Sequence, residues 1–304
     1  MNEIMDKEYA RRPFLLAVGA ILIIFAILRH YVIPDQTSTI PGGWLPFFAT
    51  ILDGLIASIF VTVGIALTIW KLTPNILKKS NIRIVEPKAL KALFRGALQT
   101  SEIWWYKGGC GRFFRTSALP TMAKCAREMS HSREVRVCIL NPLNEKTVKK
   151  HARHRSSTAS GQAEEWTESQ VRNELYATIV TTLLYQIEAP ALRITLSLIP
   201  SYSAFRIDLS DDYAIITKED REAPAIVCDR GTYFYKSYKD EIGLAESQGD
   251  TVPPLRDNQM NLSELTVANL KPLLEEVKLW SDRITTSDQE KIVNLIQNPV
   301  NPYA

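Results

Sequence analysis

The chain has 304 residues, with 36 lysines and arginines against 33 aspartates and glutamates, so its formal net charge at pH 7 is only +3. A balance this close to neutral excludes an argument for nucleic-acid binding from overall charge. The four cysteines are scattered, without the paired spacing of a metal site or the framework of a disulfide-rich domain, and are typical of a reducing compartment.

Two long apolar stretches, residues 13–33 and 45–70, dominate the N-terminal part of the chain. At about 1.5 Å of rise per residue, each is long enough to cross a hydrocarbon core of about 30 Å as a helix. We therefore expect a transmembrane helical hairpin within residues 1–74. The first stretch is longer than the apolar core of an ordinary signal peptide and lacks a following small-residue cleavage site, which favours retention of both spans.

Basic residues flank the hairpin mainly on one side. Three precede the first span and four follow the second: Lys7, Arg11, Arg12, Lys71, Lys78, Lys79 and Arg83. The first apolar run has no lysine or arginine up to Leu28, and the connector is taken as residues 29–43. It holds only Arg29 and His30 as bases, with Asp35 opposing them. Because cytoplasmic flanks are enriched in lysine and arginine, this bias predicts a multi-pass protein with both termini in the cytoplasm.

Small residues recur every four positions in the second stretch. They are Gly54, Ser58, Thr62 and Ala66. At 3.6 residues per turn they form one stripe on a helix, and such stripes let helix backbones approach closely in lipid. The stripe predicts packing against the first span, whose Ala17, Gly19 and Ala20 are also small, or self-association into an oligomer, and the two interpretations are compatible.

Asp53 is an acidic residue within the second apolar stretch. A carboxylate in a span is costly and is by default a functional hypothesis. If the hairpin self-associates, Asp53 would line a water-filled centre and favour cations. The alternative is that Asp53 reaches the outer headgroups or caps the start of the helix after Pro46.

From residue 75 the composition becomes polar and mixed. We expect a juxtamembrane connector at 75–86, an α/β domain at 87–260 and a C-terminal helical segment at 261–304. Helical periodicity covers 87–100, 119–129, 146–155 and 166–187, and strand-like runs cover 102–106, 133–140, 192–199, 204–209, 213–217 and 225–227. Strands interleaved with helices predict an α/β sheet sandwiched by helices.

The first candidate binding feature is a glycine-rich turn after the strand at 102–106. Gly108, Gly109 and Gly111 permit positive φ and a close approach of the backbone to a ligand. Arg112 and Arg115 then begin the next helical segment, where free N–H groups suit an anion. The turn matches neither the dinucleotide nor the P-loop glycine pattern. The alternative is a tight turn with surface arginines.

The second candidate feature is the run at 146–155, where seven of ten residues can carry a positive charge. Lys149, Lys150, Arg153 and Arg155 belong to it and would attract phosphates in a salt-dependent way. The alternative is an ordinary solvated face. Arg206, with Asp208 and Asp211 at the end of a later strand, would join the same cleft or form salt bridges in the sheet.

Several of these elements resemble half of a phospholipase D-like domain. The likeness rests on the Ile-Trp-Trp-Tyr strand, the glycine turn, the Val-Arg-Val-Cys-Ile-Leu strand and the segment 203–212, and covers roughly residues 87–240. The catalytic signature of that superfamily, His-x-Lys followed four residues later by Asp, is missing. The resemblance therefore implies a degenerate, non-catalytic domain. If the domain were an enzyme, His151 and His154 would be the only substitutes for the missing histidine nucleophile.

Spans joined to such a domain also resemble the two-span effectors of bacterial anti-phage defence, of the retron-associated and cyclic-oligonucleotide classes. The turn at 108–115, the helix at 166–176 and the strand at 203–212 carry this likeness. It implies an inner-membrane protein held inactive by a partner, a reverse transcriptase with attached DNA, or switched by a nucleotide. Released, it would self-associate and permeabilise the membrane, as in abortive infection.

Three functions therefore follow from the sequence. The first is a non-enzymatic membrane effector that requires no cofactor or metal. The second is a membrane-tethered phosphodiesterase or lipid hydrolase, which predicts that His151→Ala or His154→Ala abolishes activity. The third is a passive scaffold that recruits a partner to the bilayer, which would tolerate Asp53→Ala and Ser58→Leu.

Overall fold

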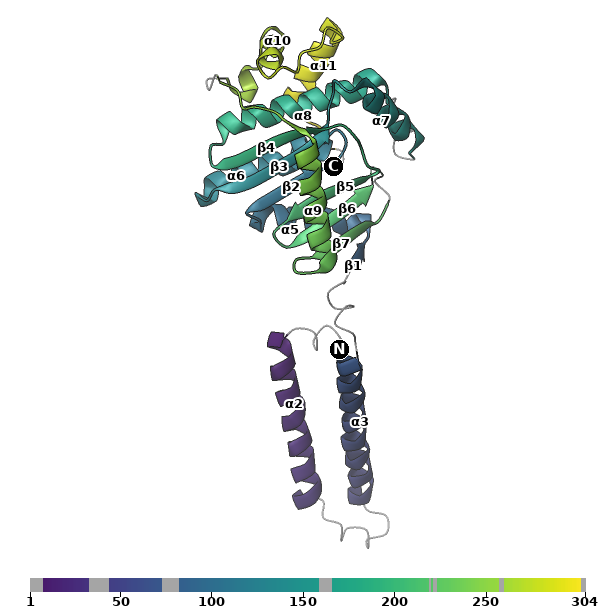
Figure 1. Ribbon diagram of the computed structural model, residues 1–304. Helices are drawn as coiled ribbons and strands as arrows, with labels where there is room; N and C mark the ends of the chain where they lie inside the picture. Colours follow the sequence, from purple (N-terminus) through teal and green to yellow (C-terminus); the bar gives the residue numbers. More distant parts are fainter. Residues whose placement is uncertain are drawn as a thin grey trace. The chain divides into compact units, whose positions relative to one another are not determined.

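A computed structural model of the chain describes residues 8–32, 44–72, 82–158, 166–218, 220, 223–256 and 260–301 (Figure 1). It divides into two compact units, Met1–Lys78 and Lys79–Ala304. We describe each unit by itself and call the second the α/β unit.

The N-terminal unit contains two long helices. Helix α2, Glu8–Ile27, continues into a π-helical turn, η1, Leu28–Val32, and α3 covers Trp44–Leu72. Among the described residues, one helical segment is long and apolar enough to cross a membrane, Pro46–Thr68, with a mean hydropathy of 2.1. The apolar part of the described first helix, Leu16–Tyr31, is shorter. The two-span hairpin is thus supported for α3 and remains a prediction for α2.

One face of α3 lies toward α2. Leu52 is buried, and Ile56, Ile59, Val63 and Ala66 are half-buried. These positions recur at the three- and four-residue spacing of one helical face. In contrast, Gly54, Ser58 and Thr62 are exposed, so three of the four residues of the small-residue stripe do not pack against α2 in the described structure.

Arg29 and Asp53 connect the two helices. Arg29 Nε, in the π-helical turn, donates to the Asp53 carboxylate of α3 at 2.9 Å. An opposite charge at this distance reduces the cost of holding either group in an apolar environment. In this structure Asp53 is therefore part of an ion pair that links the helices.

The α/β unit is built on one eight-stranded mixed sheet, with the order β1-β7-β6-β5-β2-β3-β4-β8. The strands are β1 (Ile82–Val85), β2 (Ile103–Lys107), β3 (Arg133–Leu140), β4 (Leu192–Ile199), β5 (Phe205–Ser210), β6 (Tyr213–Lys218), β7 (Ala225–Asp229) and β8 (Asp250–Thr251). The three central strands β2, β3 and β4 are parallel, and the other neighbours pair antiparallel.

Helices cover both faces of the sheet (Figure 1). They are α5 (Pro87–Thr100), α6 (Leu119–Met129), α7 (Glu145–Ser157), α8 (Glu168–Glu188), α9 (Tyr233–Gln248), α10 (Val267–Glu276) and α11 (Thr286–Gln297). Helix α9 crosses one face, from β7 to β8, while α6 and α8 pack on the other face beside α5. Helices α7 and α11 pack in turn on α8, which explains why α8 is buried on almost every side.

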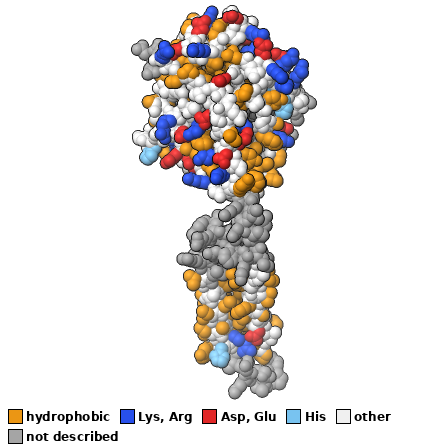
Figure 2. All heavy atoms as spheres, viewed as in Figure 1, with side chains coloured by type: hydrophobic (Ala, Val, Ile, Leu, Met, Phe, Trp, Pro, Cys, Tyr) orange, Lys and Arg blue, Asp and Glu red, His pale blue; other side chains and the backbone are white. Residues whose placement is uncertain are grey.

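The described surfaces of the two units differ in composition (Figure 2). Hydrophobic side chains dominate the visible surface of α2 and α3. In contrast, basic side chains (lysine and arginine) and acidic side chains (aspartate and glutamate) are both spread over the visible face of the α/β unit. A helix surface of this composition is typical of a helix that lipid or other protein covers, and the mixed surface is typical of contact with water.

The expected elements agree closely with the structure at α5, α6, β3 and β4, whose bounds are those of the predicted segments. Two differences concern the ends of the sheet. Residues 82–85, which we expected within a juxtamembrane connector, form edge strand β1, paired with β7. The two-residue strand β8 at the opposite edge was not predicted.

The largest missed element is α9, whose sixteen residues have little apolar periodicity. Only Tyr235, Ile242 and Ala245 of this helix are buried, because it crosses the sheet at a single layer with water on its other side. The C-terminal residues form α10 and α11 as expected, and α11 packs on α8, so this segment belongs to the α/β unit.

Candidate functional site

The glycine turn follows β2 at the carboxyl end of the parallel strands, the edge where open α/β sheets bind ligands. A Cβ at Gly108 would contact the Tyr106 hydroxyl and lie 3.1 Å from Arg206 Cγ. Gly111 has φ +72°, and a Cβ there would lie 2.9 Å from Thr178 Cγ2. Gly108 and Gly111 are thus explained by close packing against protein atoms.

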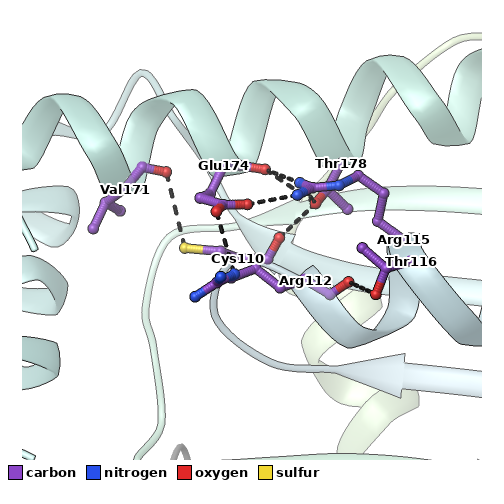
Figure 3. Close-up of polar contacts among 7 residues, drawn as sticks. All are labelled: Cys110, Arg112, Arg115, Thr116, Val171, Glu174 and Thr178. Carbon is purple, nitrogen blue, oxygen red and sulfur yellow. Dashed lines mark hydrogen bonds and ion pairs between the residues drawn. The ribbon is translucent and has the colours of Figure 1, made fainter. Parts of the chain in front are cut away.

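Beyond the turn, Arg115 lies in a buried polar cluster with α8 (Figure 3). Its Nη2 donates to the Glu174 carboxylate at 2.7 Å, and its Nη1 donates to the Glu174 carbonyl at 3.0 Å and to Thr178 Oγ1 at 3.1 Å. Thr178 Oγ1 in turn donates to the carbonyl of Cys110 at 2.6 Å. Arg115 is 4% exposed and Glu174 1% exposed, so this arginine is held by the protein.

Arg112 shares the same carboxylate. Its Nε lies 3.2 Å from Glu174 Oε1, and its guanidinium carbon lies 5.4 Å from the centre of the Trp166 ring. Arg155 of α7 stacks on the same indole at 4.2 Å. The structure therefore brings the glycine turn and the basic helix together through Trp166. Figure 3 shows Arg112 beside Glu174.

The remaining cations of the basic helix lie on its outer face. Lys149, Lys150 and Arg153 are exposed, and Lys149 Nζ is 3.8 Å from the carboxylate of Glu168. Surface pairs of this kind contribute little to stability. These three residues fit the solvated-face interpretation, and only Arg155 of the predicted basic set joins the glycine turn.

Arg206 packs beside Gly108 of the glycine turn and against α5. Its Nε donates to Asp208 at 2.6 Å, and its guanidinium lies over the rings of Phe94 and Phe113 at 5.3 and 4.9 Å. Burial raises the pKa of Asp208 above its ordinary value, although the charge and hydrogen bond of Arg206 and a hydrogen bond from Trp104 oppose the shift. Arg206 and Asp208 thus form the predicted salt bridge within the sheet.

Asp211 and the histidines also have structural surroundings. Asp211 accepts hydrogen bonds from the backbone N–H groups of Glu102 and Ile103, at 2.6 and 3.1 Å, and so fixes the start of β2. His151 is buried against the ring of Tyr202, with His154 on the same ring. Within the described residues, no group of three histidines, cysteines or carboxylates is arranged to hold a metal ion.

Two important acidic residues were missed by the sequence analysis. Glu174 is one of several polar residues that α8 buries, together with Asn173, Thr178, Thr181 and Thr182, and it is the charged one among them. Asp288 accepts from Ser169 at 2.5 Å and Asn173 at 2.9 Å and joins α11 to α8. No local pattern indicates this contact, because Asp288 lies more than a hundred residues after Ser169 and Asn173 in the chain.

No protein-family model matches the chain, and no curated protein matches it. Among solved structures, it is similar to Nuc, a phospholipase D family member from Salmonella typhimurium, with 10% identity and a TM-score of 0.33 over 56% of this chain and 97% of that one. It is also similar to TrmBL2, an archaeal chromatin protein, with 9% identity and a TM-score of 0.30 over 67% of this chain and 66% of that one. Neither likeness carries an argument about fold or activity, so the phospholipase D-like domain stays a prediction.

Proposed function

We propose that this chain is a membrane-embedded, non-enzymatic effector that permeabilises the membrane when its α/β unit changes state. One observation carries the proposal. Only 6% of the most apolar stretch within Pro46–Thr68 is buried inside the protein. Because so much apolar helix surface is costly in water, lipid or other copies of the helix must cover it.

The outward face of α3 supports self-association. Gly54, Ser58 and Thr62 are exposed on a side that α2 leaves uncovered, and small residues allow close contact between helices in lipid. A ligand or partner that binds one state of the α/β unit more tightly would shift the equilibrium between separate and associated helices. By the resemblance to anti-phage effectors, we propose that the released state causes abortive infection. We also propose that the state of the α/β unit is set either by a reverse transcriptase with its attached DNA or by a nucleotide.

The direct test is to induce the full chain in bacteria and follow membrane potential with a potential-sensitive dye. We expect depolarisation with the unmodified chain and a large reduction with Ser58→Leu, because a leucine would separate the helices. Ala57→Leu is the matched control, since Ala57 is also exposed and lies about a quarter turn away. Equal depolarisation by both variants would contradict the role of the stripe.

Normal potential and growth in every condition, including phage challenge, would contradict the effector itself. A passive scaffold would retain its partner at the membrane in both variants without any leak. An enzyme would instead lose an activity on nucleotides or phospholipids when His151 or His154 is replaced.

A further inference from the structure

A cavity of about 460 Å³ lies between α5, the start of α6 and the end of β6. Its size falls within the range of about 300–1,000 Å³ that small-molecule sites occupy. Apolar side chains form one wall, among them Phe94 and Phe113, whose ring centres are 4.8 Å apart. None of the described residues that line this cavity was among the predicted site residues, and Arg206, which was, lies over the Phe94 and Phe113 rings beside it.

Positive charge is concentrated on the rim of the cavity. Lys88, Lys91 and Arg95 are exposed along one side of α5, and Lys218 lies at the end of β6. Asp220 is the one carboxylate among the lining residues. No ion pair joins Lys88, Lys91 or Arg95 to another residue in the part of the chain that the structure describes, so this charge is available to an anionic ligand.

One residue of the lining carries a buried hydroxyl group without a hydrogen-bond partner among the described residues. Thr217 lines the cavity and is only 4% exposed, yet its Oγ1 has no such partner. An unsatisfied buried hydroxyl costs about 1–3 kcal/mol. Ser117 and Thr121 add two more hydroxyl groups to the lining. Ser117 belongs to the π-helical turn η3, Phe114–Ala118, and such turns occur frequently at functional sites.

The topology places the cavity at the ligand-binding edge of the sheet. Lys107, the last residue of β2, pairs with Ile207, which pairs with Ile216 of β6. Thr217 and Lys218 therefore lie just beyond the carboxyl end of β2, at the edge where open α/β sheets bind ligands.

We propose that this cavity binds a nucleoside phosphate, with the base against Phe94, Phe113 and Thr217 and the phosphate on the cations of α5. Aromatic rings stack on any base, and hydroxyl groups contact its polar edge. Lysine and arginine bind the phosphate. The inference rests on the proposed function, because it names the class of ligand that would set the state of the α/β unit.

Two other ligands explain the lining less well. An acyl chain with a phosphate headgroup would match the cations and phenylalanines but would leave the Thr217, Ser117 and Thr121 hydroxyls without partners. Inorganic phosphate would match the cations but would not fill the apolar part. Both are arms of the test.

The experiment is isothermal titration calorimetry of the full chain in detergent with AMP, GMP, CMP and UMP. Inorganic phosphate and lysophosphatidate serve as comparison ligands. We expect at least one nucleotide to bind with a Kd of about 100 µM or tighter and phosphate alone to bind at least about tenfold more weakly. Lack of binding by all four nucleotides at about 1 mM would overturn the proposal, as would tighter binding of lysophosphatidate.

Variants locate the ligand. Lys91→Ala and Arg95→Ala should each weaken nucleotide binding about tenfold, whereas Lys124→Ala on the exposed face of α6 should not change it. Thr217→Val should weaken binding about fivefold without lowering the thermal midpoint of the free protein. Its matched control is Thr181→Val, which removes another buried hydroxyl without a described partner. The assignment would be overturned if Lys124→Ala weakened nucleotide binding as much as Lys91→Ala and Arg95→Ala do. It would also be overturned if Thr181→Val weakened binding as much as Thr217→Val.

The same variants separate this inference from the proposed function. Ser58→Leu should greatly reduce depolarisation and leave nucleotide binding unchanged. If the unmodified chain binds nucleotide but never depolarises cells, the effector function fails and the binding site stands. If it depolarises cells and binds no nucleotide, the binding site fails and the effector function stands.

Discussion

Glu174 of α8 holds Arg115 of the glycine-turn segment through a carboxylate–guanidinium contact of 2.7 Å, although 59 residues separate them in the chain. Both side chains are almost completely buried. Arg112 adds a second positive charge at 3.2 Å. The relationship makes this acidic residue the anchor of the segment that the sequence indicated as an anion site.

Replacing Glu174 should therefore destabilise the α/β unit. Glu174→Gln leaves the Arg115 charge buried without an opposite charge, and breaking a buried pair in this way costs about 3–5 kcal/mol. The measurement is urea unfolding of the full chain in detergent, followed by circular dichroism. Glu168→Gln is the control, because Glu168 forms only an exposed pair with Lys149 and should cost less than about 1 kcal/mol. A loss below about 1 kcal/mol for both would contradict the anchoring role.

Gly111 should not tolerate a side chain. Its φ of +72° disfavours L-residues, and a Cβ would lie 2.9 Å from Thr178 Cγ2, so Gly111→Ala should lower the free energy of unfolding by about 1–3 kcal/mol. Gly243→Ala is the opposite case. Gly243 lies within α9, where a Cβ would meet no neighbouring atom within 4 Å, and alanine should stabilise the helix by about 0.5–1 kcal/mol. Thermal unfolding midpoints that move in the same direction would contradict this prediction.

The Arg29–Asp53 ion pair should stabilise the two helices whichever helix carries the positive charge, whereas two like charges should destabilise them. Arg29→Asp or Asp53→Arg alone places two like charges beside each other in an apolar helix pair, so the level of membrane-inserted protein should fall. The double exchange restores one charge of each sign and should recover most of that level. Quantitative immunoblotting of membrane fractions gives the measurement. Failure of the double exchange to recover would show that the pair itself does not stabilise the helices.

The stability of the α11–α8 contact should depend on acidic pH. Burial by itself would raise the pKa of Asp288, but hydrogen bonds from Ser169, Asn173 and Thr285 outweigh it and hold the pKa well below the ordinary 3.8. A depressed pKa contributes stability above pH 3.8 that is lost as the pH falls further toward the folded-state value. Asp288→Asn should therefore unfold at lower urea concentration at pH 7, and its difference from the unmodified chain should shrink below pH 3.8.

The control for this pH series is Asp240→Asn on the exposed side of α9, which should follow the unmodified chain at every pH. A constant difference between Asp288→Asn and the unmodified chain, from pH 7 down to the acid limit of the titration, would contradict the assigned hydrogen-bond network. The comparison removes the general effect of acid on other carboxylates, since both chains share them.

Local periodicity explains why most elements were predictable. An apolar stripe such as Leu90, Phe94 and Leu98 specifies α5 without any distant contact, because helix formation depends on neighbours three and four residues away. The same reasoning failed for α9, whose burial is limited to three side chains, and for β1, whose pairing with β7 joins residues 140 or more positions apart.

The candidate sites were less predictable than the elements. The sequence indicated Arg112 and Arg115 as part of an anion site or as surface arginines of a tight turn, and it could not show that Glu174 neutralises them. Lys88, Lys91 and Arg95 were visible as charges on α5, yet only the arrival of Thr217 and Lys218 from β6 makes them the rim of a cavity. Charges become a site only when the fold sets their distances and excludes water.

By itself, the sequence determined an apolar helix long enough to span a bilayer, followed by a polar segment of alternating strands and helices, because hydropathy and short-range periodicity are local properties. Only the tertiary structure decided which charges are consumed by internal pairs and which remain on the surface. The physical reason is that the energy of a charge depends on its burial and on partners such as Glu174, which the chain brings into contact only after folding.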